Sequence, residues 1–370
     1  MLFKIINLYP DLYSKEKDKL LAISNILKSH GERKNIVIAE RDALITIIKS
    51  DSYGELEKIY SEDILSNIRE VSNLTSTLQI HVVIDFENTT RTSIYDEKSK
   101  AILAGYKLFT DTEKINHPSF LAENESDYEF YKIISTVYLK HELKANIGIN
   151  FSFCLGAGSH CKAEFNRLKS ENKIVFCIVD NDKAHPNKKE GDTSSAFTNE
   201  DRCINGLSFV EVLLHREIES LIPLKIMEEI VVEKIQDKIS TMDEIKSSCA
   251  TNNMFMKHFD FKEGIDLQEM ISLDNTHGNF WTEIIAHNPR FNTKDCLRYK
   301  SPKHCAECSC CPKINGISEH LLSHALEKIE RTNTKSIYQN LDPIIRSEWS
   351  RLGHLISSWG CHLKYGASRT

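Results

Sequence analysis

Acidic residues recur in this sequence just after short apolar runs, in an order that could build a metal centre. They are Glu123, with Asp127 one helical turn further on, then Asp180 and Asp182, and finally Glu217 and Glu219. Asp180 and Asp182 alternate directly after a run of six apolar residues, a spacing that points both side chains to the same side of a strand end. Two adjacent carboxylates repel each other, and a divalent cation removes that cost. Mg²⁺ prefers hard oxygen ligands, and the chemistry typical of such a centre is phosphoryl transfer, including phosphodiester hydrolysis.

The segments around these acids predict the elements that would position them. Apolar runs at Ser119–Ala122, Ile174–Val179 and Phe209–Leu214 are expected to form strands, and the β-rich stretch Ile147–Leu155 another. Helices are expected behind a Ser126/Glu129 capping pair, over Cys161–Leu168 and around Glu217–Ile230. This alternation predicts an α/β domain with a parallel sheet. Because ligands of such sheets lie beyond the carboxyl ends of the strands, the acids should meet at one edge. Turn formation or helix capping is the alternative role for each acid taken singly.

Three regions differ in texture along the chain. Residues 1–116 form an N-terminal α/β region, 117–231 contain the expected catalytic domain, and 232–370 are mostly helical with a Cys-rich loop. Trp349 and Trp359 stand at helical spacing with apolar neighbours, which favours a core stripe over a platform for stacking bases.

Four segments of the middle region resemble the motifs of TOPRIM domains, in family order. LAENESDYEFYKII resembles the opening strand, Glu and helix, with Asn124 where those domains usually have Gly. FCLGAGSHCKAEF is similar to the second strand and its glycine turn, and IVFCIVDNDKAHP to the Asp-x-Asp motif. VLLHREIESLIP is similar to the Glu-containing segment of the overcoming-lysogenization-defect (OLD) nucleases and their phage-defence relatives. Asn is the next most tolerant residue after Gly for left-handed backbone geometry.

The resemblance implies a Mg²⁺- or Mn²⁺-dependent nuclease that cleaves DNA or RNA and takes part in defence against phage. It implies metal-ligand or base roles for Glu123, Asp127, Asp180, Asp182 and Glu219, with Glu217 as the alternative to Glu219. Lys183, beside the aspartates, could contact phosphate or be simply solvated. OLD nucleases carry an ATPase on the same chain, and this sequence has no Gly-x4-Gly-Lys-Ser/Thr loop, so an ATPase partner would have to be a separate protein.

A second metal site is predicted in the loop DCLRYKSPKHCAECSCCPK. Cys305, Cys308 and Cys311 repeat the two-residue gap that lets neighbouring thiolates share one Zn²⁺. Cys296 is a candidate fourth ligand, with His304 and Cys361 as others. Free or redox-active thiols are the alternative, because no second Cys-x2-Cys pair is present.

Other functions remain open at this stage. The stretch HVVIDFENTTR resembles the first strand of PIN-like NYN ribonucleases, with Asp85 and Asn88 at a metal site, but no later acids follow in that family's order. Other TOPRIM chemistry, topoisomerase- or primase-like, is an alternative, as is a non-catalytic zinc-containing protein that binds nucleic acid.

Bulk properties narrow the class of protein. The 370 residues are 41% hydrophobic and 27% charged, which favours two or three globular domains over disorder. A net charge of −6 excludes a uniformly basic coat but not a local basic groove. With no signal peptide and no membrane-spanning run, we expect a cytoplasmic protein without a membrane partner. The oligomeric state stays open.

Overall fold

The computed structural model describes residues 1–204, 206–300 and 311–364. The chain divides into two compact units, and each is described by itself. The first unit contains Met1–Ile178, Phe197–Glu211 and Trp349–Thr370, and the second contains Val179–Ala196 and Val212–Glu348. The boundaries of these units differ from those of the regions 1–116, 117–231 and 232–370. The chain leaves the first unit at the end of a central strand and returns to it twice.

The first unit begins with a five-stranded sheet in the order β2-β1-β3-β5-β4. Its strands are β1 (Leu2–Ile6), β2 (Ile36–Ile38), β3 (His81–Asp85), β4 (Ser93–Asp96) and β5 (Ala101–Gly105). All pairings are parallel except that of β4 with β5. The helices of this part are α1 (Lys17–Gly31), α2 (Arg41–Lys49), α3 (Glu55–Val71) and α4 (Leu74–Thr77).

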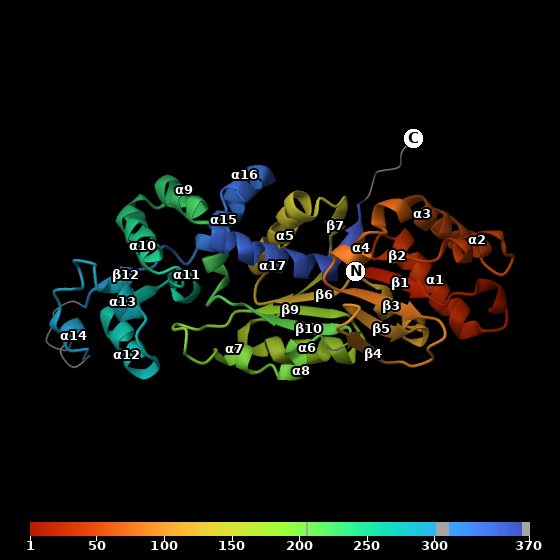
Figure 1. Ribbon diagram of the computed structural model, residues 1–370, viewed down its shortest axis with the longest axis horizontal. Coiled ribbons are helices and arrows are strands. Elements are labelled where there is room, and N and C mark those ends of the chain that lie inside the picture. The colour runs from red at the N-terminus through yellow and green to blue at the C-terminus, as the bar shows by residue number, and fades with distance from the viewer. Residues whose placement is uncertain (205, 301–310, 365–370) are drawn as a thin grey trace. The chain divides into compact units, whose positions relative to one another are not determined.

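A second sheet of the first unit has the order β10-β9-β6-β8, and Figure 1 shows β6, β9 and β10 side by side. Its strands are β6 (Ser119–Ala122), β8 (Ser152–Leu155), β9 (Val175–Val179) and β10 (Ser208–Val212). β6 pairs in parallel with both β8 and β9. Every residue of β9 is buried, as its unbroken apolar run predicts for a central parallel strand.

Side chains of this second sheet alternate between two layers of helices. Phe120 of β6 packs on Tyr131 of α5 (Glu125–Tyr138), and Phe176 of β9 stacks on Trp359 of α17 (Pro343–Gly360). Cys177, the next residue of β9, faces the other layer, where its sulfur lies 3.7 Å from that of Cys161 in α6 (Cys161–Ser170). The protein is therefore mixed α/β with a parallel-rich sheet flanked by helices, as predicted. The prediction of a core role for Trp349 and Trp359 is also confirmed, because they are 2% and 0% exposed.

Two local predictions in this region are wrong. Helix α5 begins at Glu125, so Ser126 already lies inside it, and the capping pair is Asn124 with Asp127, whose carboxylate accepts the Asn124 N–H at 3.2 Å. Asn124 is extended (φ −136°), as the N-cap position of a helix requires. The stretch Ile147–Leu155 is two strands, since β7 (Ile147–Ile149) pairs antiparallel with β13 (Cys361–Leu363) in a sheet of its own.

The second unit is mostly helical. Its helices are α7 (Asp192–Ser195), α9 (Leu224–Lys234), α10 (Ile239–Thr251), α11 (Phe255–His258), α12 (Leu267–His277), α13 (Trp281–Ile285), α14 (Asp295–Arg298), α15 (Leu321–Glu330) and α16 (Thr334–Gln339). Strands β11 (Gly264–Asp266) and β12 (Lys313–Asn315) form an antiparallel pair. In the part of the chain that the structure describes, no helix is both long and apolar enough to cross a membrane.

A salt bridge between α1 and α3 gives the first unit a defined response to pH. Arg33 donates to both oxygens of Asp63 at 2.6 and 3.2 Å, and His30 Nε2 lies 3.2 Å from the same carboxylate. Burial alone would raise the pKa of Asp63, but His30 and Arg33 together lower it to about 2. Because the folded pKa is depressed, the stabilisation is present above the unfolded value near 4 and is lost as the pH falls towards 2.

Asp63→Asn is therefore expected to lower the free energy of unfolding by about 2 kcal/mol at pH 7. The deficit should shrink as urea unfolding is repeated at pH 5, 4 and 3. Asp51→Asn, at an exposed position, is the control and should change little at any pH. A deficit for Asp63→Asn that is the same at pH 7 and pH 3 would contradict the assignment.

Candidate functional site

A sharp turn carries Asp180 and Asp182 away from the end of β9. Asn181 between them is buried, and its amide group donates to the Leu213 carbonyl at 2.9 Å and accepts from the Lys183 N–H at 2.8 Å. The Asp182 N–H donates to the Arg216 carbonyl at 3.0 Å, so the turn is fastened to the segment that follows β10. Asp182 has φ +54°, a left-handed conformation that Asp adopts more readily than most residues other than Gly. Asp182 is exposed and Asp180 is half-buried.

Glycine at position 191 gives the Asp182 side chain its space. The Gly191 N–H donates to the Asn181 carbonyl at 2.9 Å. A Cβ built on Gly191 would lie 2.3 Å from Asp182 Oδ2, closer than any atomic contact allows. Any larger residue there would displace the carboxylate, so the present position of the Asp182 side chain requires glycine at 191.

The rest of the turn is anchored by the helical part of the second unit. The Trp281 indole donates to the Ala184 carbonyl at 2.8 Å, and His258 Nδ1 lies 2.8 Å from the Lys183 carbonyl. His185 Nε2 lies 2.9 Å from the Gly278 carbonyl. Two side chains from distant segments and one side chain of the turn itself thus fix consecutive residues after the aspartates. The Lys183 side chain is half-buried, and its contact with phosphate stays a prediction.

Glu217 and Glu219 are both buried, at 6% and 3% exposure, but they make different contacts. Glu217 Oε1 accepts the Phe261 N–H at 2.6 Å, which ties this carboxylate to the backbone. Glu219 Oε1 lies 2.9 Å from the Lys262 ammonium, and Oε2 has no hydrogen-bond partner among the described residues. A buried carboxylate oxygen without a partner is costly unless a ligand satisfies it.

The predicted helix over Glu217–Ile230 is wrong at its start. The two glutamates lie in and just before a 3₁₀ turn, Ile218–Leu221, and the α-helix α9 begins only at Leu224, after Pro223. The tight turn places both carboxylates inside the unit rather than along a helix face.

One lysine couples the acids electrostatically. Lys262 lies 3.9 Å from Glu217 Oε2 in addition to its pair with Glu219. Burial would lower the pKa of Lys262, but the charges of Glu219, Glu217 and Asp180 raise it above its usual range. Burial, and then the charge of Glu219, raise the pKa of Glu217 to about 8. The charges of Glu219, Glu217 and Asp180 all act on Lys262, so these carboxylates lie near one another, and carboxylates held together favour a cation.

Glu123 and Asp127 belong to the first unit. Glu123 is half-buried and directly follows β6, the strand that pairs in parallel with β9 through Leu121 and Cys177. Its charge contributes to raising the pKa of Cys177, after burial and the neighbouring Cys161 thiol. Asp127 is occupied by the capping contact with Asn124, which is a structural role. A role for either residue at a metal stays a prediction.

The donor set fits a hard divalent cation. In the conformation described, no three His, Cys, Asp or Glu side chains from the described ranges are grouped as a metal cage. Lys262 instead supplies the positive charge beside Glu219. Among the described acids of this site, Glu219 Oε2 is the buried oxygen without a hydrogen-bond partner. Carboxylate oxygens are the donors that Mg²⁺ and Mn²⁺ prefer.

The predicted zinc site lies mainly outside the described residues, which exclude Cys305 and Cys308. Of its other ligands, Cys296 is buried and Cys311 is half-buried. Zinc binding therefore stays a prediction.

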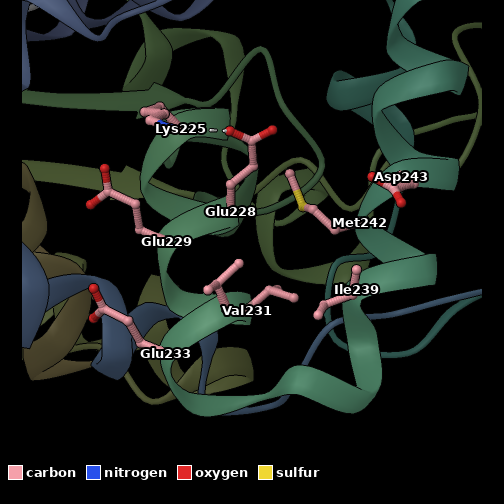
Figure 2. A pocket seen from close by; sticks show the side chains of 9 residues that line it. Lys225, Glu228, Glu229, Val231, Glu233, Ile239, Met242 and Asp243 are labelled. Carbon is pink, nitrogen blue, oxygen red and sulfur yellow. Dashed lines mark ion pairs between the residues drawn. The ribbon is translucent and has the colours of Figure 1, made fainter.

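A hollow between α9 and α10 is a poorer candidate for a metal site than the acids around Lys262. It measures about 360 Å³ and is lined by both acidic and apolar residues. Figure 2 shows Glu229 and Glu233 pointing away from Met242, so its acids do not converge. Glu228 is paired with Lys225 and Lys246, and Lys328 is paired with both Glu229 and Glu233.

Lys262, Asn181 and Gly191 could not be identified as site residues from the sequence. Lys262 lies in a short polar loop with no motif around it, and its role depends on a contact across 43 residues of chain from Glu219 (262 − 219). Asn181 is the middle residue of the Asp-x-Asp motif. The motif itself does not show that the amide of Asn181 is buried and bonded to the Leu213 carbonyl. Comparison with known protein families, with curated proteins and with solved structures found no match to this chain.

Proposed function

We propose that the protein is a Mg²⁺- or Mn²⁺-dependent nuclease, whose cation is held by Asp180, Asp182 and Glu219. The observation that carries the proposal is the buried, unpartnered oxygen of Glu219 in a cluster of carboxylates around Lys262. A protein that needed these acids only for folding would pair them fully, because an unmet buried carboxylate destabilises the fold.

The chain's own groups support hydrolysis of a phosphodiester. When bound, the cation supplies Lewis-acid activation of a phosphate oxygen and of a water molecule. Lys262, whose side chain is 38% exposed, pairs with Glu219 and presents an ammonium to a phosphate oxygen. Glu217 orients the loop that carries Lys262 through its bond to the Phe261 N–H.

We propose that Glu123 also takes part in the reaction, either as a metal ligand or as a general base. It follows β6 directly, as Asp180 follows β9, and these two strands are parallel neighbours in the sheet. The likeness of four segments to TOPRIM motifs supports the same residue set, and with it a role in defence against phage beside a separate ATPase.

Cleavage by the purified full chain is the test of this proposal. Supercoiled plasmid, linear duplex, single-stranded DNA and RNA would each be incubated with Mg²⁺, with Mn²⁺ and with a chelator. We expect metal-dependent cleavage of at least one substrate, lost in Asp180→Ala and retained in Asp237→Ala, an exposed acid of the same unit. Absence of cleavage under all conditions, equal cleavage by Asp180→Ala, or a covalent protein–DNA adduct in place of hydrolysis would overturn the proposal.

A further inference from the structure

A basic hollow lies in the first unit at the amino ends of β9 and β10. Its volume is about 290 Å³. The lining residues come from four separate stretches of chain and are Arg91, Thr92, Ser93, Leu108, Lys114, Lys169, Asn172, Lys173, Gly206, Leu207 and Ser208. The candidate acids follow the carboxyl ends of the same strands, so this hollow is a different site.

The charge of the lining is strongly one-sided. Four of the eleven residues are Lys or Arg and none is Asp or Glu, although acids outnumber bases by 53 to 47 in the whole chain. Two of the cations have acidic partners at the rim, since Lys173 pairs with Glu171 at 2.8 Å and Lys169 lies 3.7 Å from Asp201. The remaining lining side chains include hydroxyl and amide groups that can donate hydrogen bonds. Such a lining suits a compact anion.

Lys114 is the feature that a purely structural role does not explain. Its side chain belongs to a residue only 9% exposed, and lysine is almost never so buried without a partner. Its ammonium has one hydrogen bond among the described residues, a long one of 3.5 Å to the Lys173 carbonyl, and no ion pair there. Burial lowers the pKa of Lys114, and the more distant Asp111 and Glu113 oppose that shift only in part. An anion in the hollow would complete the coordination of this ammonium.

The backbone around the hollow is shaped by two left-handed residues. Asn172 has φ +58° and Gly206 has φ +68°. A Cβ on Gly206 would lie 2.6 Å from Ser93 Oγ, so glycine is needed for the Ser93 hydroxyl to stand at the wall. The shape of the hollow therefore depends on the backbone conformations of Asn172 and Gly206.

We propose that this hollow binds a phosphate group, either inorganic phosphate or the terminal phosphate of a mononucleotide, between Lys114, Lys173 and Arg91. Phosphate offers several acceptor oxygens to converging Lys and Arg donors. A volume at the lower end of the range for ligand pockets fits a small phosphorylated molecule rather than a nucleic-acid strand. The proposal is independent of the nuclease activity.

Titration calorimetry of the full chain tests the proposal, with inorganic phosphate, adenosine 5′-monophosphate, adenosine and a ten-residue single-stranded DNA as separate ligands. We expect one site per chain, with binding weakened at least 10-fold in Lys114→Gln and in Arg91→Gln, and unchanged in Lys58→Gln, a half-buried lysine outside the hollow. Arg91 is exposed, so its variant remains informative if Lys114→Gln lowers stability.

The ligands distinguish the two sources of phosphate. Equal affinity for phosphate and the monophosphate identifies inorganic phosphate as sufficient, and tighter binding of the monophosphate identifies a nucleotide. Adenosine alone should not bind. The proposal is overturned if neither phosphate ligand binds at 10 mM concentrations, if only the oligonucleotide binds, or if Arg91→Gln binds as tightly as the wild type.

Discussion

Glu219→Gln is expected to lower the rate of metal-dependent cleavage at least about 100-fold while the protein remains folded. The amide keeps the shape of the side chain but removes the charge and one acceptor oxygen, at a position that is 3% exposed. Loss of a group that merely supports a metal ligand typically costs 10- to 100-fold, so loss of a ligand itself should cost about 100-fold or more. The rate would be measured with saturating Mn²⁺ on the substrate that the wild type cleaves best.

Glu217→Gln is the matched control, because it makes the same chemical change two residues away. The amide oxygen can still accept the Phe261 N–H, so the backbone tie of Glu217 survives the substitution. We expect at most about a 10-fold loss of rate. Equal losses in the two variants would mean that the glutamates act as one unit, and a larger loss in Glu217→Gln would reverse their assigned roles.

Asp274→Ala is expected to destabilise the second unit by about 4 kcal/mol and to slow cleavage as well. Asp274 is buried and accepts the N–H groups of Phe280, Trp281 and Thr282 at 3.2, 3.0 and 2.8 Å, and the Thr282 hydroxyl at 2.6 Å. Removing the carboxylate leaves several buried donors unmet, each at a cost of about 1–3 kcal/mol. Trp281 also holds the Ala184 carbonyl, so the turn that carries Asp182 should loosen.

Hydrogen exchange at residues 280–285, together with urea unfolding, measures this effect. Asp266→Ala is the control, since Asp266 caps α12 through a single bond to the Glu269 N–H at 2.8 Å. Loss of such a cap costs about 1 kcal/mol. If Asp274→Ala were no more harmful than Asp266→Ala, the carboxylate would not be the centre of this hydrogen-bond network.

The strands of the second sheet were predictable because their signals are local. Val175–Val179 is apolar at every position, which only a strand buried on both faces requires, and Ser119–Ala122 forms β6 as predicted. The placement of acids after strand ends was also predictable, since Glu123 and Asp180 directly follow apolar runs. Helix starts were less predictable. The pairs Asn124/Asp127 and Ser126/Glu129 offer equally good caps two residues apart, and only packing of the helix decides between them.

The separation of Glu217 from Glu219 could not have been predicted. Their sequence environments are nearly the same, and the difference arises from Phe261 and Lys262, more than forty residues further along the chain. The left-handed backbone of Asp182 was equally hidden, because its N–H is bonded to the Arg216 carbonyl, which lies in a separate loop. Tertiary contacts of this kind leave no periodic signal in a single sequence.

Binding of Mn²⁺ in the absence of nucleic acid tests most directly whether the acid cluster holds a divalent cation. Electron paramagnetic resonance of free Mn²⁺, titrated with the full chain, reports the bound fraction without any need for activity. We predict at least one Mn²⁺ per wild-type chain, lost in Glu219→Gln and retained in Glu217→Gln. A wild-type chain that binds no Mn²⁺ at millimolar concentrations, or a Glu219→Gln variant that binds as the wild type does, would contradict the account.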